Sequence, residues 1–477
     1  MSRREQFVLR AAMVLAACLD RLPAQDAATI RDPFPANAAG WGPSAGDGRY
    51  YSRWAEDWAV ARANGDAPFG KAMPLGGDAS LTLGGELRLR ANRYDNARLR
   101  RGDDYGEELL RGVFGADLRL GPHLRAYGEV ATGQVGEATG AAPPNFQNDA
   151  AVSQAFVEGR TAVAGFLVGA MIGRQEFADG PRQLLSLSDG PNLHRTWNGV
   201  RLYGHGENLR VGAFEFAATR LGAGAFDDGI DGDERLRGAN ASIVLARDAR
   251  GASACLDPFW LHTEIPQVRL SGAAQDDRRD TLGVRLWGRA AGSTFDVTAA
   301  HQQGRHGDRD VDAWALFASQ SLLLDDGAWQ PRLTLHVDVA SGGAASDTGT
   351  VRTFHQLYAS SGYLGEGRFL SLANLVLCAP GIAVAPLPQT RLSVEYGFAW
   401  RFAEDDAVYG GGMRAYPGTS DVGGREIGGL LRVEARWSGP AHVGVALGYE
   451  HLEAGDALER AGLPDGDYAY ASFTVRY

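Results

Sequence analysis

The sequence predicts an all-β protein, a closed antiparallel transmembrane β-barrel of about 16–18 strands. From about residue 80 onward, segments of roughly 8–12 residues alternate apolar with polar or small side chains, and clusters of glycine, aspartate, asparagine and proline separate them. Glycine accounts for 64 of the 477 residues, about twice its ordinary share, which favours a turn-rich β protein. The sequence has no uninterrupted apolar run of about 18 residues, which argues against a membrane-spanning helix.

The alternation has a period of two, as a β-strand requires. In residues 81–90, Leu87 and Leu89 share one face, and Arg88 and Arg90 share the other. The same pattern recurs in residues 391–401, where Leu392, Val394, Tyr396, Phe398 and Trp400 lie opposite Arg391, Ser393, Glu395 and Arg401. Similar segments are found at residues 109–120, 197–203, 281–287, 332–339, 428–437 and 468–477.

A soluble β-sandwich produces the same alternation, so other details must decide between the two folds. Small residues such as Gly397 and Ala399 recur on the charged face, as expected inside a barrel wall. Trp400, Trp437 and Tyr449 lie near segment ends on the apolar face, where the interfacial aromatic girdles of barrels occur. About 400 residues at roughly 22–25 per strand and connection give the predicted strand number.

The first 25 residues have the features of a signal peptide. Arg3 and Arg4 form a cationic region, residues 11–19 form an apolar region, and cleavage is plausible after Ala24. Residues 15–18 also resemble a bacterial lipobox, which would make Cys18 a lipid-anchored first residue; both interpretations remain open. Residues 26–79 contain loop-forming proline and glycine and predict a periplasmic lead-in before a barrel of residues 80–477.

Charge and cysteine content exclude several classes of function. The formal net charge of −11 removes the electrostatic attraction that nucleic-acid binders depend on. After Cys18, only Cys255 and Cys378 remain, and neither has a CxxC or Cys/His neighbourhood. We therefore expect no metal site, no cofactor and no nucleic-acid partner.

Short sequence stretches, in their order and spacing, resemble the alginate-export family of bacterial outer-membrane barrels over about residues 50–477. The stretches are RWAEDW (53–58), LTLGGELR (81–88), QAFV (154–157), GRQE (173–176), GPNLHR (190–195), WNGVRL (197–202), TFHQL (353–357), REIG (425–428) and GYEHL (448–452). The resemblance implies a monomeric porin-like barrel in the bacterial outer membrane with a cluster of basic side chains in its lumen. In the type case of the family, that constriction passes polyanionic alginate.

The strand pattern places many arginines on the face opposite the apolar one. Turning an arginine toward lipid would cost about 2–4 kcal/mol near the membrane midplane, so these side chains should face water. Arginine also suits an anion pathway, because its planar fork binds carboxylates through two hydrogen bonds and keeps its charge. The predicted lumen arginines are Arg88, Arg90, Arg111, Arg201, Arg285, Arg391, Arg432 and Arg436, and the GRQE motif of the family adds Arg174. Luminal acids such as Glu86, Glu395 and Glu434 could pair with them, so structural pairing and substrate contact both remain open for each arginine.

Two segments predict irregular structure within the barrel region. Residues 353–367, rich in glycine, tyrosine and serine, are a candidate constricting loop. Residues 374–388 are strongly apolar, but Pro380, Pro386 and Pro388 argue against a central strand throughout them, so two strand ends around a turn are expected.

These observations favour a channel, an outer-membrane porin for diffusion or export of an anionic saccharide such as alginate or of a small acidic solute. Its expected partners are that solute, membrane lipid and, through residues 26–79, periplasmic secretion proteins. Two other classes of function remain open: an outer-membrane barrel enzyme and a structural component of a secretion complex. The chain has no G-x-S-x-G motif, and Ser360 and Ser361 near His355 are too generic to indicate a catalytic triad, so we do not expect an enzyme.

Overall fold

The computed structural model describes residues 34, 44–46, 49–50, 53–136, 142–178, 183–248, 253–270, 274–343, 349–360, 362–439 and 442–477. The expected signal peptide of residues 1–25, including Cys18, lies outside the described residues, as does most of the segment up to residue 52.

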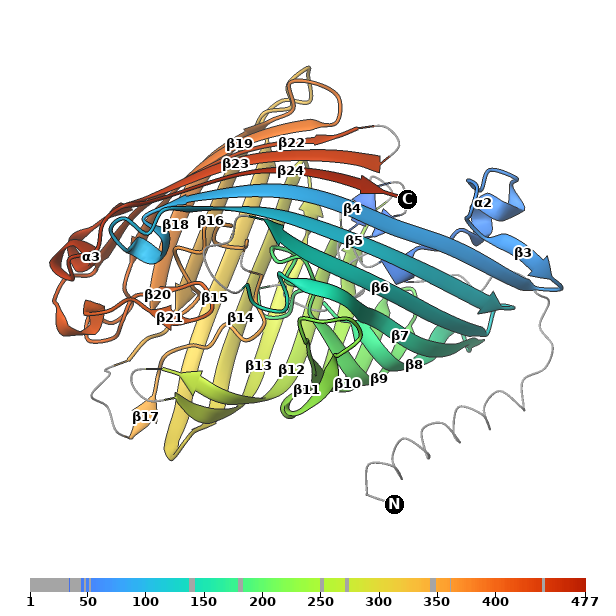
Figure 1. The fold of residues 1–477 in the computed structure, drawn as a ribbon, viewed down its shortest axis with the longest axis horizontal. Coiled ribbons are helices and arrows are strands. Elements are labelled where there is room, and N and C mark those ends of the chain that lie inside the picture. Colours follow the sequence, from blue (N-terminus) through green and yellow to red (C-terminus); the bar gives the residue numbers. More distant parts are fainter. Residues whose placement is uncertain are drawn as a thin grey trace.

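Eighteen long strands form one closed barrel, which confirms the predicted fold class (Figure 1). Each long strand runs antiparallel to its neighbours, and β24 pairs with β4 to close the wall. The strands are β4 (Ala79–Asp95), β5 (Tyr105–Leu120), β6 (Leu124–Gly136), β7 (Asn148–Val163), β8 (Phe166–Glu176), β9 (Thr196–His205), β10 (Leu209–Arg220), β11 (Gly229–Arg247), β12 (Ser253–Arg269), β13 (Ala274–Ala290), β14 (Ser293–His306), β15 (Arg309–Leu323), β16 (Arg332–Ala340), β18 (Leu375–Val384), β19 (Thr390–Trp400), β22 (Glu426–Ser438), β23 (Val443–Ala454) and β24 (Gly466–Arg476).

The remaining described elements are short. Two of the strands, β3 (Met73–Gly76) and β17 (Thr350–Val351), pair at the margins of the barrel sheet. The others are β1 (Ser44–Gly46), β2 (Arg49–Tyr50), η1 (Arg53–Ala55), α2 (Ala59–Ala63), η2 (Ala97–Leu99), β20 (Tyr409–Gly410), β21 (Arg414–Ala415), η3 (Thr419–Asp421) and α3 (Asp456–Arg460). Among the described residues, none of the helices has the length and apolar character needed to cross a bilayer.

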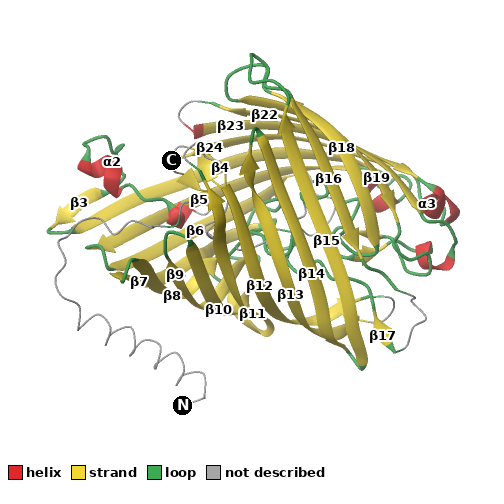
Figure 2. Cartoon of the chain, turned by 180° about the vertical axis from the view of Figure 1, so that it is seen from behind, coloured by secondary structure: helices red, strands yellow, loops and turns green. Residues whose placement is uncertain are grey.

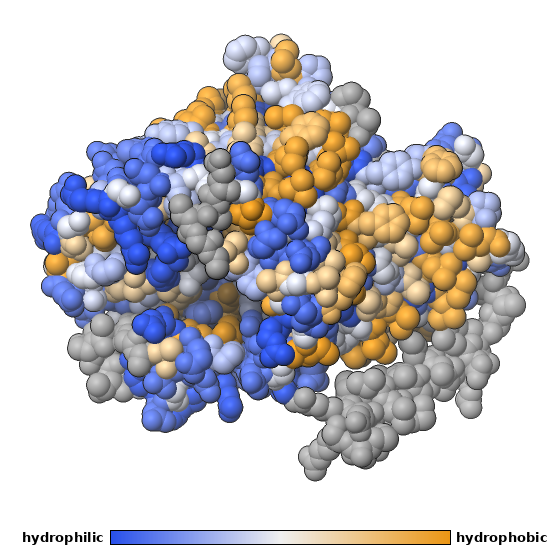
Figure 3. Space-filling model, in the orientation of Figure 1, coloured by the Kyte–Doolittle hydropathy of each residue, from blue (hydrophilic) through white to orange (hydrophobic). Residues whose placement is uncertain are grey.

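The period-two pattern of the sequence determines which side chains form the outer surface. On β4, Leu87 and Leu89 are each 45% exposed, whereas Glu86 and Arg88 on the opposite face are 6% and 4% exposed. On β19 the apolar Phe398 is likewise exposed on the outer face. Figure 3 shows apolar side chains gathered over the wall and charged ones around the end that carries α3. The apolar face therefore points outward, as a barrel in lipid requires.

The two ends of the barrel differ in the length of their connections. At the end that carries β3 and Tyr477, the turns are short, for example residues 121–123, 164–165 and 291–292. At the opposite end, long segments join β8 to β9, β16 to β18 and β19 to β22. We call these the short-turn end and the long-loop end; in outer-membrane barrels they face the periplasm and the cell exterior, respectively.

One expectation for the wall was wrong. Residues 375–384 form a single strand, β18, although Pro380 lies within it. On one side β18 pairs with β16 without interruption, and Leu335 lies opposite Pro380. On the other side, the pairing with β19 runs up to Cys378 and resumes at Gly381. The missing N–H of the proline thus coincides with a gap in the ladder, and tertiary pairing holds the strand together around it.

The core of the molecule lies inside the barrel rather than between layers. The β8–β9 loop (described residues 183–195) and the β16–β18 loop (described residues 349–360 and 362–374) fold into the lumen (Figure 2). Apolar side chains of both loops are buried there. Leu184, Leu185, Phe354 and Tyr358 are all less than 5% exposed. The second loop includes the predicted constricting segment 353–367, which lies within the lumen.

The lead-in before the barrel also enters the lumen, at the short-turn end. The side chain of Arg53 is buried and its guanidinium contacts Glu86 of β4 at 3.4 Å and Glu129 of β6 at 3.0 Å. Lys71 is buried as well, donates to the carbonyl of Leu83 at 2.8 Å and lies over the ring of Tyr477. Arg53 and Lys71 therefore fix the two ends of this segment to the inner wall.

Candidate functional site

A cavity of about 550 Å³ lies between the inner wall of β4, β5 and β22–β24 and the two inward loops. Aspartate 189 of the β8–β9 loop and Glu366 of the β16–β18 loop reach it from the lumen side. Five arginines line the cavity: Arg88, Arg90, Arg111, Arg436 and Arg476. Cationic side chains thus outnumber carboxylates around this space.

Arg88 and Arg111 lie side by side on β4 and β5, and both bind the β8–β9 loop. Arg88 donates to the backbone carbonyls of Asp189 at 2.6 Å, Gly190 at 3.2 Å and Pro191 at 2.7 Å. Arg111 binds the Asp189 carboxylate at 2.7 Å and also donates to the carbonyls of Asp189 and Pro191. Most of the hydrogen bonds that the Arg88 and Arg111 guanidinium groups donate therefore anchor the β8–β9 loop to the wall.

Glutamate 86 holds Arg111 in place from the wall. Its carboxylate accepts from Arg111 at 2.9 Å, from Arg476 at 2.8 Å and from Arg53 at 3.4 Å. Arg476 was not among the predicted lumen residues. The alternation of residues 468–477 could have indicated it, because Arg476 shares the polar face of this strand with Ser472 and Thr474. Arg53 precedes the barrel and has no periodic pattern that could have revealed it.

Arg90 anchors the second inward loop. Its guanidinium bonds to Glu366 at 3.0 Å and to the Tyr468 hydroxyl at 2.6 Å, and it lies over the Tyr470 ring at 4.4 Å. Next to this contact, the carboxylate of Glu450 on β23 accepts the backbone N–H groups of Glu366 and Gly367. The β16–β18 loop is thus fixed to the wall beside the cavity.

The two inward loops also bind each other. Tyr358 donates its backbone N–H to Leu184 and accepts from the N–H of Ser186 through its carbonyl, each at 2.9–3.0 Å. Arg195 adds a hydrogen bond to the same carbonyl at 3.0 Å. A shift of one loop therefore disturbs the other.

Electrostatics strengthen the anchorage of the β8–β9 loop. His194 lies 2.5 Å from Glu176 and 2.7 Å from Asp189. Burial lowers the pKa of His194, but the charge of Glu176 and the hydrogen bonds to both carboxylates outweigh it and raise the pKa to about 9. Desolvation raises the pKa of Asp189, but the charge of Arg111 outweighs this effect and holds that pKa well below its ordinary value.

Arg391, Arg432 and Arg436 lie on the inner face of β19 and β22. Arg432 pairs with Glu395 at 2.9 Å, and Arg436 pairs with Glu434 of its own strand at 2.7 Å. Arg391 lies opposite Arg436 in the strand register and is exposed, without a side-chain hydrogen bond or ion pair to any residue the structure describes.

The other predicted arginines lie elsewhere along the wall, away from this cavity. Arg174 bonds to Asn198 at 3.0 Å and to the carbonyl of Val152 at 2.8 Å. Arg201 is fully buried against the ring of Phe177, and Arg285 pairs with Asp296. Of the nine predicted residues, Arg88, Arg90, Arg111 and Arg436 line the cavity and the other five do not.

Comparison with solved structures places the fold among outer-membrane channels. OccAB1 from Acinetobacter baumannii superposes with a TM-score of 0.56 at 13% identity, covering 86% of this chain and 98% of its own. The outer-membrane protein OpdK from Pseudomonas aeruginosa has a TM-score of 0.54 at 15% identity, with coverages of 83% and 98%. A BenF-like porin from Pseudomonas fluorescens Pf-5 has a TM-score of 0.54 at 10% identity, with coverages of 83% and 99%. No curated protein gives a sequence match.

The sequence itself identifies the family. A family described as alginate export matches residues 79–472, which span nearly the whole barrel. Together with the porin fold, this match confirms the expected location in the bacterial outer membrane, assigns the protein to channel-forming barrels and makes the short-turn end the periplasmic end. The chain belongs to the alginate-export family.

Proposed function

We propose that this barrel lets an anionic saccharide such as alginate, or a small acidic solute, diffuse across the outer membrane along its inner arginines. The observation that carries the proposal is the cavity of about 550 Å³ whose lining contains five arginines and two carboxylates. A lumen wall with excess positive charge lowers the entry barrier for carboxylates, and the arginine fork can bind them in a bidentate way.

The arginines divide into two groups by their present partners. Arg88, Arg90 and Arg111 are engaged with the inward loops, so they shape the pathway by fixing these loops inside the lumen. Arg391 and Arg436 lie opposite each other on β19 and β22, and Arg391 forms no side-chain hydrogen bond or ion pair with the residues that the structure describes. This second group supplies the positive charge that a passing carboxylate would meet.

A solved structural neighbour supports the class of solute. OpdK has been crystallised with vanillate, which is an aromatic carboxylate. At 14% identity this likeness concerns the fold, and the solute of the present chain rests on its own arginines. We further propose that the barrel acts as a monomer.

Planar-bilayer recording tests the proposal. Under a gradient of potassium chloride, the wild-type reversal potential should have the sign of anion selectivity, and trimannuronate should interrupt the current. The double variant Arg391→Gln/Arg436→Gln should shift the reversal potential toward cation selectivity. Arg93→Gln is the matched control, because Arg93 lies on the outer face of β4, paired with Asp95. A cation-selective wild type, or a double variant with unchanged selectivity, would refute the mechanism.

A further inference from the structure

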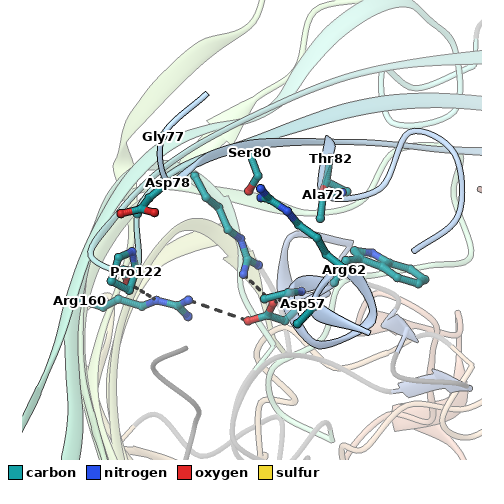
Figure 4. Close-up of a pocket in the computed structure, with 14 residues that line it drawn as sticks. Asp57, Arg62, Ala72, Gly77, Asp78, Ser80, Thr82, Pro122 and Arg160 are labelled. Carbon is teal, nitrogen blue, oxygen red and sulfur yellow. Dashed lines mark hydrogen bonds and ion pairs between the residues drawn. The ribbon is translucent and has the colours of Figure 1, made fainter. Parts of the chain in front are cut away.

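A second cavity, of about 310 Å³, lies at the periplasmic mouth of the lumen, between the lead-in segment and the inner wall (Figure 4). One side is formed by Asp57, Trp58 and residues of α2. The other side is formed by the inner faces of β4, β5 and β7 and by the turns at residues 77–78 and 121–122. Its volume lies at the lower end of the range typical of small-molecule sites.

Three arginines line this cavity, and their hydrogen-bonding capacity differs. Arg119 has a partner for each of its three nitrogens: Asp57 at 2.7 Å, Asp117 at 3.2 Å and the carbonyl of Glu56 at 2.8 Å. It therefore serves to fix the lead-in on the wall.

The other two arginines retain donors that face the cavity. Arg160 donates to the carbonyl of Pro122 at 3.3 Å and lies 3.9 Å from Asp57, beyond hydrogen-bond distance. Arg62 forms no side-chain hydrogen bond or ion pair with any residue in the described part of the chain, and in Figure 4 it extends from α2 into the pocket, toward the wall that carries Ser80. Two guanidinium groups are thus available to an anion.

The carboxylates of the cavity cancel only part of this charge, because two of them, Asp57 and Asp78, stand against three arginines. Asp57 already accepts from Arg119 and from the backbone N–H of Ala59. Although burial raises the pKa of Asp57, the Arg119 guanidinium holds it below its ordinary value, so this carboxylate stays charged and occupied. Asp78 is exposed on the β3–β4 turn at the edge of the pocket. The interior is left with the unoccupied donors of Arg62 and Arg160.

The rest of the lining suits a sugar ring rather than a simple inorganic anion. Trp58 is half-buried on the lead-in side of the cavity, and its indole N–H donates to the Glu56 carboxylate at 3.0 Å. Ala59 and Ala63 extend this apolar side, while Ser80 and Thr82 provide hydroxyl groups on the opposite side. An apolar surface facing a few polar groups and paired arginines matches a sugar that carries a carboxylate.

We propose that this cavity is a periplasmic binding site for one uronate unit of an acidic saccharide, with Arg62 and Arg160 holding the carboxylate and Trp58 the face of the ring. The proposal rests on the proposed function for the class of solute. It adds a place where the solute is bound before or after it crosses the lumen.

Isothermal titration of the full-length protein in detergent with trimannuronate tests the site. Arg62→Gln and Arg160→Gln should each weaken binding at least about 10-fold, because each removes charge-assisted hydrogen bonds to the carboxylate. Trp58→Ala should weaken binding as well, and the neutral maltotriose should not bind to the wild type. Arg460→Gln is the matched control, because Arg460 pairs with Asp456 on α3 at the opposite end of the barrel. Arg62 has no described side-chain contact, so its variant should retain the wild-type fold.

Bilayer recordings on the same variants separate this proposal from the channel function. Weakened binding with unchanged anion selectivity upholds the site as distinct from the lumen arginines. Weakened binding in a channel that lacks anion selectivity also upholds the site and refutes the proposed function alone. Unchanged binding in both arginine variants, or a wild type that does not bind trimannuronate, overturns the site whatever the selectivity.

Discussion

Replacing Arg111 with methionine should release the β8–β9 loop from the barrel wall. Arg111 is almost completely buried and contacts two carboxylates, those of Glu86 and Asp189, at 2.9 and 2.7 Å. It also donates to three backbone carbonyls of the loop, including that of Asn192 at 2.6 Å. Methionine preserves much of the side-chain length and removes all of these contacts.

The structure sets the size of the effect. Removing one partner of a buried ion pair costs about 3–5 kcal/mol. Glu86 keeps Arg476 and Arg53 as partners, and Asp189 keeps His194, so neither carboxylate is left alone. We therefore expect the lower end of the range, about 3 kcal/mol, which makes the open state of the loop roughly 100-fold more populated.

Hydrogen exchange followed by mass spectrometry measures this opening directly. Peptides from residues 183–195 should exchange about 100-fold faster in Arg111→Met than in the wild type, including the amide of Leu193, which donates to the Asn145 carbonyl. The single-channel conductance should rise as the loop leaves the lumen. Arg93→Met, on the outer face of β4 beside Asp95, should change neither quantity. Wild-type exchange and conductance in Arg111→Met would show that the loop does not depend on this arginine.

Two further predictions concern pH and lipid. The pKa of His194 is raised to about 9, above its ordinary value of 6.5, so its stabilisation of the loop is complete below about pH 6.5 and is lost as the pH rises through 9. Hydroxide catalyses the exchange of every amide, so the measured rates are first divided by the intrinsic rate at each pH. The resulting protection of residues 183–195 should fall between pH 7 and 10 in the wild type, and a similar fall in His194→Gln would contradict this assignment. Leu89→Arg, on the exposed apolar face, should lower the free energy of folding into vesicles by about 2–4 kcal/mol, whereas Leu89→Val should have little effect. Equal stability of both Leu89 variants in urea titrations would mean that this face does not contact lipid.

The wall of the barrel could be predicted from the sequence because lipid and water impose opposite demands on alternate residues. Leu87 and Arg88 are adjacent, and their exposures follow directly from that alternation. The prediction failed at Pro380, where local chemistry argues against a strand, but β16 supplies an uninterrupted partner on one side. Whether a strand forms around a proline depends on the strands that pair with it, and the identity of the residue does not reveal those partners.

The interior was harder to predict because it depends on which loops fold inward. The period-two alternation indicates that Arg88 shares a face with Arg90. It does not indicate that Arg88 binds three carbonyls of residues 189–191. Every residue has a backbone carbonyl, so the sequence does not mark these three as partners of an arginine. Arg53 was missed for the same reason, because its partners Glu86 and Glu129 become neighbours only once the lead-in enters the lumen.

The seam between β4 and β24 has a consequence for biogenesis. Its two sides are joined by contacts such as Glu86–Arg476, which are 390 residues apart along the chain. A ribosome must release almost the entire polypeptide before the first hairpins can find their final neighbour, and a bilayer does not tolerate an unpaired strand margin meanwhile. The chain therefore has to reach the outer membrane unfolded, bound by chaperones. It can insert only when both β4 and β24 are available to pair.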